Sequence, residues 1–166
     1  MNRATLYFFM IPLLGILAIV QSVVIPRLAI ANVRPDVMVL LVVVWALLFG
    51  GSGALLIGFV AGLWMDVLSG GPMGGSSLAL MAVALLTGMS YNRFFRSNLL
   101  FPVISIVLGT LIYSYAYWGI LALTNHRLPL WDTTLRLIFP AVVYNGAIML
   151  LVIPFLNRLP EQREVG

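Results

Sequence analysis

The chain has 166 residues, of which 62% are hydrophobic and 8% are charged. A soluble domain is about 25% charged, so this composition excludes an ordinary water-soluble core and indicates a chain that lies mostly in lipid. In lipid the backbone must satisfy its own N–H and C=O groups, which leaves helices or a closed barrel. The apolar runs are continuous and do not alternate, so they favour helices. Cysteine is absent, which excludes disulfides and thiolate metal sites.

Six apolar segments fill the length of the chain, and a helix that spans a membrane needs about 20 residues. We therefore predict an all-α membrane protein with a single membrane domain over residues 1–166. Gly50 to Gly53 is expected to separate the second helix from the third, and Ser69 to Gly75 the third from the fourth. In chain order, the helices are expected at about 4–25, 36–49, 54–68, 76–91, 99–123 and 135–156.

Two features leave the helix boundaries open. The second and third helices are short for a bilayer, so we expect them to extend into the flanking connectors and cross it. A helical hairpin that does not fully cross is the alternative. In the last helix, Pro140 is expected to kink or start the helix, and Pro154 to stop it.

The charges indicate an orientation but no nucleic-acid site. The formal charge of +4 comes from nine arginines that are too dispersed to follow a phosphate backbone. Six crossings put both termini on one side, and the small excess of arginines there favours cytoplasmic termini. That side would carry Arg3, Arg93, Arg96, Arg158 and Arg163, and the outer side Arg27, Arg34, Arg127 and Arg136.

Small residues form a stripe along the third helix. Ala54, Gly58, Gly62 and Asp66 recur every four residues, and Gly58 and Gly62 make a GxxxG motif. Small residues let two helix backbones approach closely in lipid. The stripe is therefore interpreted as a groove for a partner helix or as internal packing within the bundle, and a leucine at Gly58 or Gly62 is expected to block such a partner.

Asp66 closes the stripe just before a glycine-rich turn. A carboxylate in a membrane helix is costly and needs a partner, which we expect to be an outer arginine or the backbone N–H groups of the turn. The favoured role is a structural clamp for the turn formed by Gly70, Gly71, Pro72 and Gly74. Proton transfer or substrate binding by Asp66 is the alternative.

A few other polar residues have predicted roles. Asp36 follows Pro35 and is expected to cap the second helix, because a carboxylate is favourable at the positive helix end. Asn145 and Gln21 lie inside apolar helices, where they are expected to hydrogen-bond neighbouring helices. No nucleophile–base set, metal motif or nucleotide loop is visible, and His126 is expected to be solvated. We therefore predict no enzymatic activity, no metal and no cofactor.

Two stretches resemble the rod shape-determining membrane protein MreD family. They are Arg34-Pro35-Asp36-Val37, leading into an apolar helix, and the run from Gly58 to Gly74, GFVAGLWMDVLSGGPMG. Tyr144-Asn145 and the ending Pro154-Phe155-Leu156-Asn157-Arg158-Leu159 are also similar to the family. One departure is Gly75-Ser76-Ser77, where the family has a bulkier, often polar residue.

The resemblance implies a scaffold of the bacterial cell-elongation machinery in the inner membrane, with both termini cytoplasmic. It implies binding of the transmembrane helix of MreC, and through MreC an influence on the glycosyltransferase RodA and a class B penicillin-binding protein. It also implies a six-helix fold like that of the substrate-binding (S) components of energy-coupling-factor transporters. Membrane lipids are the other expected contacts, and a homodimer is possible.

Two rival functions remain from the sequence. A vitamin-type S component would bind a small molecule on the outer side, where Arg34, Asp66, Tyr117 and Arg127 could converge. A membrane enzyme or proton-coupled transporter would use Asp66. The absence of matching broken helices in the two halves argues against a transporter.

Overall fold

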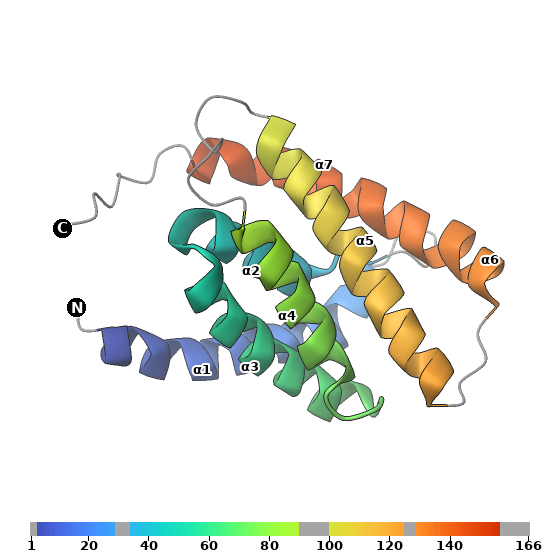
Figure 1. Ribbon diagram of the computed structural model, residues 1–166, viewed down its shortest axis with the longest axis horizontal. Helices are drawn as coiled ribbons and strands as arrows, with labels where there is room; N and C mark the ends of the chain where they lie inside the picture. Colours follow the sequence, from blue (N-terminus) through green and yellow to red (C-terminus); the bar gives the residue numbers. More distant parts are fainter. Residues whose placement is uncertain (1–2, 29–33, 90–99, 125–128, 157–166) are drawn as a thin grey trace.

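The computed structural model is a bundle of helices, and it describes residues 3–28, 34–89, 100–124 and 129–156 (Figure 1). Within these ranges every regular element is a helix, which confirms the predicted all-α class. The elements are α1 (Arg3–Ile19), the π-helix η1 (Val20–Val24), the 3₁₀-helix η2 (Ile25–Leu28), α2 (Val37–Phe49), α3 (Gly51–Ser69), α4 (Gly75–Gly88), α5 (Leu100–Leu123), α6 (Leu130–Thr133), the π-helix η3 (Thr134–Ile138) and α7 (Phe139–Leu156).

Four helical segments are long and apolar enough to cross a membrane. They are Met10–Arg27, Gly51–Ser69, Leu100–Leu123 and Leu130–Phe155, and each leaves large apolar side chains on its outer surface. Such exposed apolar faces are what a membrane protein presents to lipid. The helices α1, α3 and α5 run toward one end of the bundle and the last segment runs back, so that α1 begins and α7 ends toward the same side, on the left of the view (Figure 1).

The short helix α2 lies in the middle of the bundle. Its neighbours are α1, α3, α4 and α5, and it supplies much of the core. A helix that is apolar all round is expected to be enclosed by others. Because its neighbours enclose it, α2 contributes to the bundle without being long enough to span lipid by itself. Its buried residues are Met38, Val39, Val42, Val43, Ala46 and Leu47.

The boundaries of α3 and α4 differ from those predicted. The expected break at Gly50 to Gly53 is reduced to Gly50, whose φ of 84° is a conformation that favours glycine. The helix resumes at Gly51, so α3 has 19 residues and is not short. Instead α4 is the second short helix, with 14 residues ending at Gly88. The predicted end of this helix, at residue 91, lies outside the described residues.

The first and last helices also extend further than predicted, and the cause is the same in both. The first continues through Pro26 to Leu28, and the last begins at Leu130 rather than at 135. A proline lacks the N–H for the helical hydrogen bond, and its ring clashes with the carbonyl four residues earlier. In each case a π-helical turn ends two residues before a proline, Pro26 or Pro140. The wider turn accommodates the proline, so the helix is not broken there.

Candidate functional site

Asp66 joins the end of α3 to the start of α4. Its side chain is 2% exposed. Its Oδ1 accepts a hydrogen bond from the backbone N–H of Ser76 at 2.8 Å, and its Oδ2 accepts one from that of Gly74 at 2.9 Å. Ser77 adds longer contacts to Oδ2 from its N–H at 3.4 Å and its hydroxyl at 3.3 Å. The carboxylate therefore caps α4 from a neighbouring helix, and among the described residues its partners are not arginines.

The glycines of the α3–α4 turn are needed there for different structural reasons. Gly70 and Gly74 have φ values of 66° and 90°, which side-chain-bearing residues rarely adopt. At Gly71 a Cβ would lie 2.6 Å from the hydroxyl oxygen of Tyr117, so glycine here leaves room for that ring. The carbonyl of Pro72 accepts the N–H of Gly75 at 3.0 Å and closes the turn.

The small-residue stripe of α3 contacts α4 of the same chain. Ala54, Gly58 and Gly62 are all buried. A Cβ at Gly58 would lie 3.0 Å from the backbone oxygen of Leu80, and one at Gly62 would lie 2.2 Å from the Cα of Ser77. The backbones of α3 and α4 are therefore in close contact at these glycines, as is typical of GxxxG pairs. A partner helix could reach these glycines only if α4 moved away, so the stripe is not an open groove in this conformation.

A second buried polar cluster joins four helical segments around the start of α2. Gln21 donates to Asp36 Oδ1 at 2.8 Å and accepts from the Met38 N–H at 3.0 Å. The Asp36 N–H donates to Asn145 Oδ1 at 2.9 Å, and Asn145 in turn donates to Thr110 Oγ1 at 3.0 Å. Asp36 also caps α2, because its Oδ1 accepts from the Val39 N–H at 3.2 Å.

This cluster was only partly visible in the sequence. Gln21 and Asn145 stand out as amides in apolar helices, and Asp36 as a cap. Thr110 was missed, because a threonine in a membrane helix usually bonds its own i−4 carbonyl, as Thr110 does to Ile106 at 2.8 Å. No sequence spacing relates Thr110 to Asn145.

Asp36 lies in the connector before α2, outside the membrane-spanning segments. Burial raises the pKa of its carboxyl above the ordinary value, and the hydrogen bonds from Gln21 and the start of α2 oppose that rise. A raised folded-state pKa means that the stabilisation is fully present below the ordinary carboxyl pKa and is lost as the pH rises through the folded-state value.

The Asp36→Asn variant tests this electrostatic effect. The Asn Oδ1 can still accept from Gln21 and Val39, so we expect its unfolding free energy to lie within about 1 kcal/mol of the wild type at neutral pH. The variant should lack the loss of stability that the wild type shows as the pH rises above the ordinary carboxyl pKa. Asp36→Ala leaves both donors unpaired and should lose about 2 kcal/mol. Unfolding in detergent at several pH values measures both effects. Equal stability of the Asn and Ala variants would contradict this role.

Beside this cluster lies a cavity of about 590 Å³ at one end of the bundle. The segments that form it are η1, η2, residues 34–36 just before α2, the ends of α3 and α5, and the beginning of the last helix. Its lining combines polar, charged, aromatic and apolar side chains from all of these segments. The polar and charged side chains are Gln21, Ser22, Arg34, Asp36, Ser69, Tyr113, Ser114, Tyr117 and Thr133.

The structure brings together only some of the residues predicted to converge on the outer side. Arg34 and Tyr117 line the cavity, whereas Asp66 does not, because α4 uses its carboxylate. Arg127 and His126 lie outside the described residues, as do Arg93, Arg96, Arg158 and Arg163. No group of three histidine, aspartate or glutamate side chains within the described part of the chain is placed to hold a metal.

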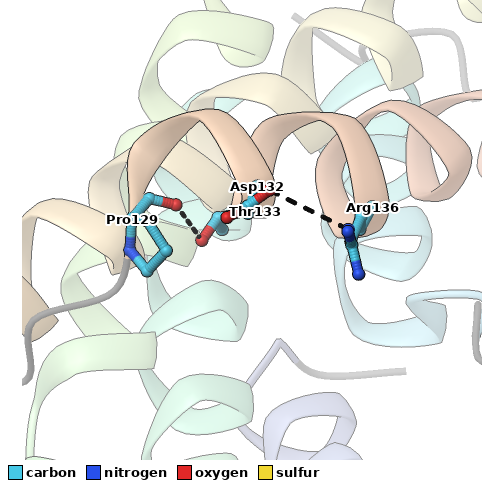
Figure 2. Close-up of polar contacts among 4 residues, drawn as sticks. All are labelled: Pro129, Asp132, Thr133 and Arg136. Atoms are coloured by element: carbon cyan, nitrogen blue, oxygen red, sulfur yellow. Dashed lines mark hydrogen bonds and ion pairs between the residues drawn. The ribbon is translucent and has the colours of Figure 1, made fainter.

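Arg136 lies on the exposed surface of the bundle and does not line the cavity. Its guanidinium Nε lies 3.9 Å from Asp132 one turn earlier, and both side chains are largely exposed (Figure 2). An exposed pair of this kind contributes about 0–1 kcal/mol. On the same helix, the hydroxyl of Thr133 bonds the carbonyl of Pro129 at 2.9 Å (Figure 2). Arg34 is therefore the arginine that, among the described ones, lines the cavity.

A family model described as the rod shape-determining protein MreD matches residues 2–162 of the chain. No curated protein and no solved structure matches the chain. The likeness to S components therefore stays a prediction.

Proposed function

This chain belongs to the MreD family of rod shape-determining proteins, and we propose that it is a non-enzymatic scaffold of the cell-elongation machinery in the bacterial inner membrane. In this proposal both termini are cytoplasmic. The protein binds the single transmembrane helix of MreC, and through MreC it supports peptidoglycan synthesis by RodA and a class B penicillin-binding protein. The observation that carries the proposal is the family match over nearly the whole chain.

The structure favours a lipid-facing surface for the partner helix. Because α4 covers the glycine stripe of α3, we place the partner on the opposite side of α3. There a row of large apolar side chains follows helical spacing and is 42–56% exposed. Helix pairs in lipid are held by close packing of their side chains, so this row offers a continuous contact along α3. It consists of Leu56, Phe59, Leu63 and Val67.

Site-specific photo-crosslinking tests both the partner and the face. A photoreactive residue at Leu56 or Leu63 is expected to crosslink MreC in membranes severalfold more than one at Val143 or Leu151 on the exposed face of α7. Co-purification of MreC in mild detergent is the parallel measurement. Absence of MreC from the purified material would contradict the partner, whereas crosslinks only from α7 would contradict the face but not the partner.

The cavity is the specific observation that favours the second candidate, binding of a small molecule as an S component does. Its volume lies within the range of about 300–1,000 Å³ that is usual for ligand pockets. Native mass spectrometry of the purified protein would reveal a retained soluble molecule.

A further inference from the structure

The cavity lies at the helix ends, at the level expected for lipid head groups. Its walls come from helix ends: α3 and α5 finish there, and α2 and the last helix begin there. Since α3, α5 and the last helical segment are long enough to cross a bilayer, their ends reach its polar surface. A phospholipid in the adjoining leaflet thus has its head group at the level of the cavity.

The cavity carries one charge of each sign at neighbouring positions. Arg34 and Asp36 both line it, separated only by Pro35. The Asp36 Oδ1 accepts the bonds from Gln21 and Val39, and its carboxyl lines the cavity. Arg34 is exposed and forms no ion pair with another described residue. A ligand with a cationic and an anionic group a few bonds apart would complement both.

The remaining walls suit an ammonium group attached to an apolar body. The rings of Tyr113 and Tyr117 lie nearly parallel, 7° apart with centroids at 6.0 Å, and Trp118 follows in the lining. Aromatic rings attract cations, and the hydroxyls of Ser22, Ser114 and Thr133 can accept N–H donors. Apolar side chains complete the lining: Ile25, Met65, Leu68, Leu121, Leu137 and Ile138.

Both π-helical turns contribute to this cavity. Gln21 and Ser22 come from η1, and Leu137 and Ile138 come from η3. A π turn changes the directions of the side chains it carries and occurs often at functional sites. Besides accommodating the two prolines, these turns therefore supply side chains to one cavity from two different helices.

We propose that this cavity binds the head group of a zwitterionic phospholipid, of which phosphatidylethanolamine is the simplest. The phosphate lies against the Arg34 guanidinium. The ammonium lies against Asp36, the neighbouring hydroxyls and the tyrosine rings, and the start of the acyl chains covers the apolar side chains. The proposal is independent of MreC binding.

The test is lipid binding by the full chain, purified in detergent and titrated with phosphatidylethanolamine or phosphatidylglycerol under native mass spectrometry. The wild type is expected to retain one phosphatidylethanolamine per chain and to prefer it to phosphatidylglycerol about tenfold, since phosphatidylglycerol lacks the ammonium. Arg34→Gln should weaken phosphatidylethanolamine binding by about tenfold. Asp36→Asn, which keeps the hydrogen bonds to Gln21 and Val39, should abolish the preference between the two lipids.

Arg27→Gln is the matched control. Arg27 is an exposed arginine on the same side of the bundle, in η2, and does not line the cavity, so this variant should bind like the wild type. Glycerophosphoethanolamine, the head group without acyl chains, should compete only at much higher concentration. If glycerophosphoethanolamine competed at the same concentration as the lipid, the cavity would be a site for a soluble ligand and the proposal would be overturned. It would equally be overturned by equal retention of the two lipids by the wild type, or by a loss in Arg27→Gln as large as in Arg34→Gln.

Discussion

Gly62→Ala is expected to destabilise the folded protein by about 2–3 kcal/mol, although alanine favours helices over glycine. The added methyl group would lie 2.2 Å from the Cα and 2.3 Å from the N of Ser77. Both are backbone atoms of α4, so no side chain can rotate away to make space. The two helices must separate, and the separation would weaken the hydrogen bonds between Asp66 and the start of α4. Thermal unfolding in detergent, followed by tryptophan fluorescence, measures the loss.

Gly146→Ala is the matched control for this prediction. Gly146 is also buried in an apolar helix, α7, but a Cβ there would meet only the Val107 Cγ2 at 3.8 Å, an ordinary contact. This variant should be as stable as the wild type or gain up to about 1 kcal/mol. Equal stability of the two alanine variants would show that α3 and α4 are not packed as described.

The stability of the Gly62 variants also decides how a loss of MreC binding is interpreted. Gly62→Leu would lose MreC if the partner helix lay on the glycine stripe, but it would also lose MreC if α3 and α4 came apart. The unfolding measurement separates these cases, because only the second lowers the stability of the chain without its partner.

Features that depend on neighbouring residues were predictable from the sequence. The apolar runs predicted the helical class, and the Pro35-Asp36 pair predicted the cap of α2 because a cap depends on a few consecutive residues. The helix ends were less accurate. The glycines at 50–53 and Pro26 were interpreted as breaks, and Pro140 as a kink or a start, whereas Gly51 begins α3 and the helix passes through Pro26 and Pro140. Neighbouring helices and π turns offset the local cost of these residues in ways that local patterns do not encode.

The cavity could not be predicted as a set of residues. Ser22, Asp36 and Tyr117 meet there from three helical segments far apart in the chain, and their spacing carries no common period. The sequence correctly associated Arg34 with Tyr117, because both were placed near one end of the bundle, but it added Asp66, which lies at the same level and is directed into the α3–α4 turn. The depth of a residue in the membrane can be derived from a sequence. The direction in which its side chain points within the bundle depends on how the helices pack.

Asp66→Ala is expected to have the largest effect of a single side-chain truncation in this turn, a loss of about 3 kcal/mol or more in unfolding free energy. The change would leave the N–H groups of Gly74 and Ser76 without their acceptor. An unpaired buried donor costs about 1–3 kcal/mol, and more when the lost partner is charged. Asp66→Asn retains one acceptor oxygen and should lie between the alanine variant and the wild type.

Asp132→Ala provides the comparison, because it removes an exposed carboxylate whose described ion pair, with Arg136, is long. That variant should change stability by no more than about 1 kcal/mol. Unfolding in mixed micelles gives the free energies, and the amount of each variant in the membrane gives an independent measure of folding. A capping role requires that stability falls in the order wild type, Asp66→Asn, Asp66→Ala. If Asp66→Asn were as stable as the wild type but failed to support rod shape, the carboxylate would be acting through its charge or its proton, and the clamp would not be its main role.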